Sequence, residues 1–172
     1  FKALLSHLSK DGVLVGIDAD EEAVQRGKDA SALAQASVHV VHDNFRNLGT
    51  ILDRLHIQTI DKALFDLGWS SYHLSAGRGF SFQVDEPLHM TYGTPQEGKT
   101  AADIINLASE EALADMLCAL GEERFARSIA RAIVEVRAQA PITTTKELVD
   151  AVLQGTPVWY QRRRIHPATK TF

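Results

Sequence analysis

The fold class follows from one stretch near the start of the chain, Val13-Leu14-Val15-Gly16-Ile17, which runs into Asp18-Ala19-Asp20. A continuous apolar run of this length is typical of a strand buried on both faces of a parallel sheet. Asp20 can cap a helix that we expect over 21–36, because the acids that open it suit the positive end of the helix dipole. The stretch therefore predicts a strand, a polar turn and a helix.

Two further strands are predicted downstream. The first is Val38-His39-Val40-Val41-His42, which ends at Asp43-Asn44-Phe45. The second is Lys62-Ala63-Leu64-Phe65, which ends at Asp66-Leu67-Gly68. A short helix is expected between them, over 48–55. Three strands that alternate with helices predict an α/β fold with a parallel, Rossmann-like sheet.

The sequence changes character after the third predicted strand. Residues 68–100 hold many Gly, Ser and Pro residues, which is typical of a long functional loop. The chain then becomes helical, with a Ser109 cap, a strong helix over 122–140 and a capping box at Thr144-Thr145-Lys146-Glu147. Cys118 falls on an apolar helical face, where we expect it in the core.

Three segments are predicted from this pattern. We expect a partial Rossmann-like domain over 1–95, a small all-helical domain over 96–155 and a basic segment over 156–172 that returns to the first domain. A parallel sheet of three strands is small for a stable domain, so we also expect further strands beyond the two ends of this chain.

Composition excludes several protein classes. The 172 residues are 45% hydrophobic and 23% charged, which excludes a disordered chain. A single cysteine excludes a disulfide scaffold and fits the cytoplasm. No apolar run reaches the length of about 18 residues that a membrane helix needs. No His or Cys spacing resembles a zinc site, so no metal is expected.

The predicted strand ends hold the candidate ligand contacts, because ligands of open parallel sheets bind beyond the carboxyl ends of the strands. An acid such as Asp18 can accept hydrogen bonds from ribose hydroxyls, Phe45 can offer an apolar face to an adenine, and Asp66 ends the third predicted strand. A helix cap is the structural alternative for Asp18, and a core aromatic is the alternative for Phe45. These residues leave both NAD and S-adenosylmethionine open as cofactors.

The motifs of the chain, taken in order, resemble one family. They are Gly16-Ile17-Asp18-Ala19-Asp20, Asp66-Leu67-Gly68-Trp69-Ser70-Ser71, Arg78-Gly79-Phe80-Ser81-Phe82, Thr100-Ala101-Ala102-Asp103, Gly121-Glu122-Glu123-Arg124-Phe125-Ala126, Ile129-Ala130-Arg131-Ala132-Ile133-Val134, Pro141-Ile142-Thr143-Thr144-Thr145 and His166-Pro167-Ala168-Thr169-Lys170-Thr171-Phe172. Together they closely resemble the bacterial 16S ribosomal RNA cytosine-N4 methyltransferase family (RsmH, also called MraW). The resemblance covers essentially the whole chain.

The resemblance implies a Rossmann-like methyltransferase domain that binds S-adenosylmethionine, with a helical domain inserted into it. It implies methylation of the exocyclic N4 of a cytidine in the decoding region of the small ribosomal subunit. The family's cofactor contacts fall on Asp18, Phe45 and Asp66. A further contact, a glutamine in the family, falls on His73, and His89 stands where the family usually has Asp. We also expect the family's Gly-Gly-His cofactor loop before the first residue and its closing strands after the last.

The reaction needs help because the lone pair of the cytosine amine is delocalised into the ring. A carboxylate that accepts the N–H hydrogen bonds stabilises the positive charge that develops on this nitrogen. Asp66 is the candidate for this catalytic role, and a purely cofactor-binding role is its alternative. Ser70 and Ser71 can add hydrogen bonds to the RNA substrate, and capping of their own loop is their alternative.

Two groups of arginines are candidates for RNA contact. Arg124 and Arg131 are seven residues apart and share one helix face, with Arg127 between them. A stripe facing phosphate and an ordinary solvated face both fit this pattern. Arg162, Arg163 and Arg164 form a denser basic run in a segment that holds no acid.

Two other functions stay open at this stage. One is an NAD-dependent Rossmann oxidoreductase, which rests on the strand-end acid alone. The other is a non-catalytic factor for ribosomal RNA binding or assembly. For the leading hypothesis the expected partner is the small ribosomal subunit with its 16S ribosomal RNA. We expect no membrane association, and a homodimer is left open.

Overall fold

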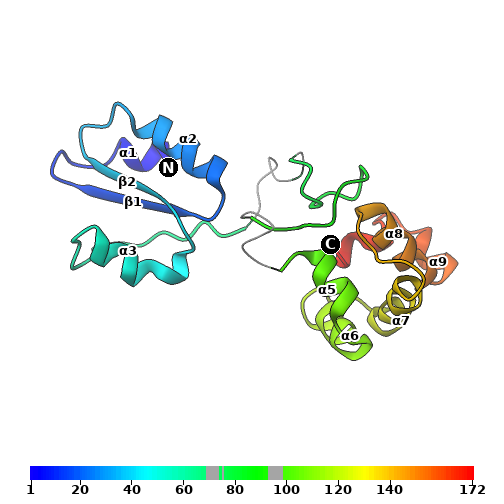
Figure 1. The fold of residues 1–172 in the computed structure, drawn as a ribbon. Helices are drawn as coiled ribbons and strands as arrows, with labels where there is room; N and C mark the ends of the chain where they lie inside the picture. The colour runs from blue at the N-terminus through cyan, green and yellow to red at the C-terminus, as the bar shows by residue number, and fades with distance from the viewer. Residues whose placement is uncertain (69–73, 75, 93–98) are drawn as a thin grey trace. The chain divides into compact units, whose positions relative to one another are not determined.

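The computed structural model describes residues 1–68, 74, 76–92 and 99–172. The chain forms two compact units, residues 1–67 and residues 68–172 (Figure 1). The first unit is mixed α/β with a small parallel sheet, and the second is helical. How the whole protein divides into domains, with the boundaries expected near 95 and 155, stays a prediction.

The first unit is built around a β-α-β motif. Strand β1 (Val13–Asp18) pairs in parallel with β2 (Ser37–His42), and the register runs from Val13 opposite Ser37 to Asp18 opposite His42. Helix α2 (Glu21–Ser31) makes the crossover between them. The short helix α1 (Lys2–Leu5) lies with α2 on one side of the strands in Figure 1, and α3 (Leu48–Arg54) lies on the other.

The predicted Asp20 cap is confirmed. Its carboxylate accepts a hydrogen bond from the Glu22 N–H at 3.3 Å, and the residue is buried. The helix itself is shorter than predicted, because it ends at Ser31 and a turn precedes β2.

The predicted third strand is wrong. Residues 62–67 run without regular structure, and the sheet has two strands in the part of the chain that the structure describes. Leu64 is 74% exposed and Phe65 is 62% exposed. A parallel strand gains its stability from neighbouring backbone and from apolar cover on both faces. Because neither reaches this segment, the apolar run does not form a strand here.

The second unit contains a set of helices around one core. They are α5 (Ala101–Leu107), α6 (Glu110–Ala119), α7 (Ala126–Arg137), α8 (Thr145–Gln154), α9 (Val158–Gln161) and the 3-10 turn η3 (Pro167–Lys170). Helix α7 packs against α6 and α8, and Ile129 and Ile133 are fully buried between them. Cys118 is exposed on α6, so the prediction of a core cysteine is wrong. It lies one turn after the buried Ala114, at the exposed edge of the side that Leu113 and Leu117 mark.

Helix α7 begins four residues later than predicted. Glu122 adopts a left-handed backbone with φ 49°, which breaks the helical path. The Glu123 carboxylate then accepts the Phe125 N–H at 2.8 Å, so the chain turns before the helix begins at Ala126. The sequence pattern could not show this turn, because the residues on both sides of it are good helix formers.

The loop over 76–92 is fastened to the helical unit. Leu88 is fully buried in the helical core, and its N–H donates to the Thr143 carbonyl at 2.8 Å. The Thr145 hydroxyl donates to the Val84 carbonyl at 2.9 Å and accepts from the Glu86 N–H at 3.0 Å. The start of α8 therefore holds this loop in place.

The predicted capping box of α8 is confirmed, and it has a pH dependence. Thr144 accepts the Glu147 N–H, and the Glu147 carboxylate accepts the N–H groups of Thr143 and Thr144 at 2.7 and 3.0 Å. The bond from Thr143 is the main cause that lowers the pKa of Glu147 from its ordinary value of 4.5. A lowered pKa in the folded state means that the stabilisation is present above the unfolded value and is lost as the pH falls through the folded value.

We therefore expect the helical unit to lose up to about 1 kcal/mol of stability through this group as the pH falls below the ordinary glutamate value of 4.5, since Glu147 is exposed and screened by solvent. In Glu147→Gln this part of the pH dependence is expected to vanish. Urea unfolding of both proteins across the acid range measures the difference. Equal loss of stability in the two proteins would contradict the assignment.

None of the helices within the described ranges is both long and apolar enough to cross a membrane.

Candidate functional site

The carboxyl ends of β1 and β2 meet at one edge of the sheet. The Asp43 N–H donates to the Asp18 carbonyl at 3.0 Å, which joins the two turns directly. Asp18 is exposed, and its Oδ1 accepts the Asp20 N–H at 2.9 Å. No donor from the described part of the chain reaches its Oδ2. The carboxylate is therefore held in orientation by one oxygen and can accept a ligand's hydrogen bonds with the other.

The turn after β2 is fixed by its own side chains. The Asp43 carboxylate accepts from the Asn47 side-chain amide at 2.8 Å and from the Asn44 N–H at 2.7 Å. These bonds, that of Asn47 first, lower the pKa of Asp43. Asn44 caps the 3-10 turn η1 (Phe45–Asn47) by accepting the Arg46 N–H at 3.0 Å. This turn presents the Phe45 ring at its surface.

Phe45 is 52% exposed, so it is not the core aromatic of the structural alternative. Its ring contacts the edge of Phe65, with 6.3 Å between the ring centroids and 82° between the ring planes. Asp66 follows Phe65 directly and is exposed. The structure therefore brings the segment that carries Asp66 beside Phe45, even though no third strand forms. We call Asp18, Phe45 and Asp66 the strand-end group.

Asp18 also lines a hollow of about 580 Å³ between β1, α1 and α2. Gly16 and Gly27 form part of its wall, together with the Phe1 ring. A Cβ at Gly16 would lie 2.8 Å from that ring, so a larger residue there would require the Phe1 side chain to shift. The volume lies within the range of small-ligand pockets, about 300–1,000 Å³.

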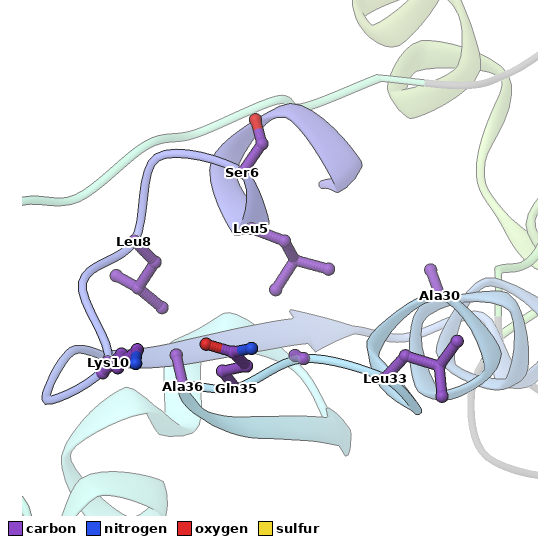
Figure 2. Close-up of a pocket in the computed structure, with 9 residues that line it drawn as sticks. Leu5, Ser6, Leu8, Lys10, Ala30, Leu33, Gln35 and Ala36 are labelled. Carbon is purple, nitrogen blue, oxygen red and sulfur yellow. The ribbon is translucent and has the colours of Figure 1, made fainter.

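A second hollow, of about 410 Å³, lies at the other end of the strands (Figure 2). Its walls come from Leu8 and Lys10 before β1, from Gln35 and Ala36 before β2, and from Leu33 after α2. These residues precede the strands instead of following them. This hollow is therefore not where a ligand of a parallel sheet is expected.

The predicted arginines divide into two kinds in the helical unit. Arg131 forms an ion pair with Glu110 at 3.6 Å. Arg124 has no such pair among the described residues, and its guanidinium lies 5.8 Å from the ring centroids of both Phe125 and Trp159. The predicted shared helix face is wrong, because α7 begins at Ala126 and Arg124 lies in the turn before it. An acid also engages Arg131.

The basic run follows the same aromatic surface. Arg163 lies 5.5 Å from the Tyr160 ring centroid. Arg162 and Arg164 are exposed on either side of it. The structure thus places one arginine of the run and one arginine of the predicted stripe on neighbouring aromatic rings.

Comparison with known proteins decides the family. A model of the MraW methylase family matches residues 1–172, which is the whole chain. The chain belongs to the MraW methylase family. This confirms the resemblance that the sequence motifs indicated. Methyltransferase membership also removes the support for an NAD-dependent oxidoreductase, which rested on one acid.

Close relatives of this MraW-family chain carry one name. The chain is 44% identical over 172 residues to "Ribosomal RNA small subunit methyltransferase H" of Syntrophotalea carbinolica, with 99% of this chain and 54% of the relative covered. It is 44% identical to the protein of that name from Desulforapulum autotrophicum (98% and 54% covered) and 42% identical to that of Clostridium botulinum (99% and 55% covered). The chain spans about half the length of these relatives.

Some predicted site residues of this MraW-family chain cannot be placed. Ser70, Ser71 and His73 lie outside the described residues. His89 is described and is half-buried, and its carbonyl accepts the Ala101 N–H at 2.8 Å. Its backbone therefore helps to join the loop to α5.

Sequence reasoning missed the aromatic surface beside the arginines. The signal was present as Val158-Trp159-Tyr160-Gln161 directly before the basic run. A helix of four residues has no periodicity to reveal which of its side chains are exposed. Only the fold shows that Trp159 contacts Phe125, at 5.7 Å between ring centroids. Within the described ranges no group of three His, Cys, Asp or Glu side chains is arranged to hold a metal ion.

Proposed function

We propose that this chain is part of an S-adenosylmethionine-dependent methyltransferase that acts on the exocyclic N4 of a cytidine in the decoding region of 16S ribosomal RNA. The relatives' names support ribosomal RNA of the small subunit as the substrate. The observation that carries the proposal is the strand-end group: the Asp18 backbone is bonded to Asp43, two residues before the exposed Phe45 ring, and that ring contacts Phe65, which directly precedes Asp66. A ribosomal substrate implies a cytoplasmic enzyme.

Two residues of this group fit the cofactor. The Asp18 Oδ2 can accept hydrogen bonds from ribose hydroxyls, while Oδ1 stays on the Asp20 N–H. Phe45 can lie against the adenine ring, because half of its surface is open. When bound, S-adenosylmethionine supplies an electrophilic methyl group. His73, which replaces a glutamine of the family, is proposed as a further contact.

Asp66 is proposed to act on the target base. Its carboxylate would accept a hydrogen bond from the cytosine amine, orient the nitrogen and stabilise the charge that develops there. Ser70 and Ser71 follow Asp66 in the sequence and are proposed to add contacts to the RNA. The base must leave its stack to reach such a site.

The helical unit is proposed as the inserted domain that contacts RNA. Its candidates are Arg124, Arg162, Arg163 and Arg164, which are exposed. Arg131 stays a candidate, although its ion pair with Glu110 offsets its charge. The small ribosomal subunit is the proposed partner, and a homodimer stays a prediction.

Calorimetry on the full-length protein tests the cofactor assignment. We expect binding of S-adenosylmethionine and none of NAD. Asp18→Asn is expected to weaken cofactor binding by about 10- to 100-fold, because hydrogen bonds to a charged acceptor are lost. Asp11→Asn, an exposed acid before β1, is the matched control and should bind as the wild type does.

NAD binding without S-adenosylmethionine binding would overturn the proposed function. A protein that binds S-adenosylmethionine and small-subunit particles but transfers no methyl group would instead be a non-catalytic assembly factor.

A further inference from the structure

An aromatic surface joins two segments of the helical unit that are far apart in the sequence. Phe125 precedes α7, and Trp159 and Tyr160 lie in α9. The ring centroids are 5.7 Å apart for Phe125 and Trp159, 4.8 Å for Phe125 and Tyr160, and 5.9 Å for Trp159 and Tyr160. Arg124 and Arg163 lie over these rings. We call these five residues the aromatic–arginine cluster.

The cluster is anchored from beneath by a buried acid. Glu123 is 2% exposed, and its carboxylate accepts the Tyr160 hydroxyl at 3.0 and 3.3 Å. The same carboxylate accepts the Phe125 N–H at 2.8 Å. Two of the three rings are therefore tied to one carboxylate, so the surface is formed before any partner arrives. Preformed surfaces lose less conformational entropy on binding.

The outer side of the cluster is open. Trp159 is 54% exposed, although its ring packs edge-on against two other aromatic rings. Arg124 and Arg163 are also exposed. The segment over 156–172 has four basic residues and no acid. The surface thus combines a large exposed ring with an excess of positive charge.

We propose that the aromatic–arginine cluster binds single-stranded RNA, with an unpaired base stacked on Trp159 and the flanking phosphates held by Arg124 and Arg163. The inference rests on the proposed function and adds to it a position for RNA. Base stacking on aromatic rings together with arginine contact to phosphate is the usual chemistry of single-strand binding. A duplex keeps its bases stacked inside, so it cannot offer a face to Trp159. An acidic peptide would satisfy the arginines but has no ring for the exposed tryptophan.

Binding of a short labelled single-stranded RNA to the full chain, followed by fluorescence anisotropy, tests the proposal. Trp159→Ala is expected to weaken binding by roughly 5- to 100-fold, as for loss of one stacked base. Trp159→Phe keeps a stacking ring and is expected to stay within a few-fold of the wild type. Val158→Ala, an exposed neighbour in α9, is the matched control and should bind as the wild type does. Circular dichroism checks that each variant is folded.

The arginines are expected to act through charge. Arg124→Ala and Arg163→Ala should each weaken binding and should each reduce its dependence on salt, because fewer counterions are released. A duplex of the same sequence is expected to bind more weakly than the single strand and to be insensitive to Trp159→Ala.

Several results would overturn the proposal. One is an unchanged affinity for RNA in Trp159→Ala. Another is an equal loss of affinity in Trp159→Phe and Trp159→Ala when both proteins are folded. A third is that poly-glutamate displaces the RNA from the wild type and that this displacement is lost in Trp159→Ala. These outcomes are separate from the fate of the proposed function. If the wild type transfers methyl groups and Trp159→Ala binds RNA with unchanged affinity, only the proposed stacking surface is wrong. If RNA binding depends on Trp159 but the wild type transfers no methyl group, only the proposed reaction is wrong.

Discussion

Asp66→Ala is expected to lower methyl transfer to small-subunit ribosomal RNA by about 100- to 1,000-fold, the usual effect of removing one group that stabilises developing charge. The reason is that the cytosine amine is a poor nucleophile, and the Asp66 carboxylate is the proposed acceptor of its N–H. The side chain is exposed in the strand-end group and follows Phe65, which contacts Phe45. Single-turnover transfer of a labelled methyl group to small-subunit particles by the full-length protein measures the effect.

The control for this experiment lies in the same segment. Asp61 is an exposed acid five residues earlier, and Asp61→Ala is expected to keep wild-type transfer. Calorimetry on Asp66→Ala separates its two proposed roles. Cofactor binding at wild-type strength together with lost transfer assigns Asp66 to the amine, and a parallel loss of both assigns it to the cofactor. Wild-type turnover would remove Asp66 from the mechanism.

Gly155→Ala is expected to lower the free energy of unfolding of the helical unit by about 3 kcal/mol, at the upper end of the usual cost of overpacking. Gly155 follows α8 with φ −79°, a backbone conformation that alanine adopts without strain. The cost comes from space alone. A Cβ there would lie 2.6 Å from the Ile129 Cα and 2.8 Å from the Ser128 carbonyl oxygen, both of which are backbone atoms of α7. Urea unfolding measures the change.

Gly49→Ala is the matched control. Gly49 lies in α3, and a Cβ added there meets nothing within 4 Å. Since alanine is the better helix former, this variant is expected to gain about 0.5–1 kcal/mol in the first unit. If Gly155→Ala unfolded at the same urea concentration as the wild type, the result would contradict the close packing of Gly155 against the α7 backbone.

Local patterns in the sequence predicted much of the fold. The apolar runs of β1 and β2, the Asp20 cap and the capping box of α8 are all confirmed. Each depends on residues within one turn or one strand, so neighbours in sequence suffice to specify it. The Asp18 position was predictable for the same reason, because it ends an unmistakable strand.

Patterns that depend on distant partners were harder to read. The run at 62–65 has the composition of a strand, but a strand also needs a neighbour and apolar cover, which composition cannot supply. The start of α7 was misplaced because a carboxylate and a left-handed residue, not helix propensity, decide where the helix begins.

The sequence by itself determined the family, the β-α-β motif and the acid at the end of its first strand, since these reside in contiguous motifs. Only the tertiary structure decided which arginines have an acid beside them and which lie on aromatic rings. Arg131 meets Glu110, and Arg124 meets Trp159. The physical reason is that Glu123 and Tyr160, 37 residues apart, share a buried hydrogen bond that draws α9 onto the start of α7. Such a bond has no local signature, because its two halves gain their partner only when the chain is folded.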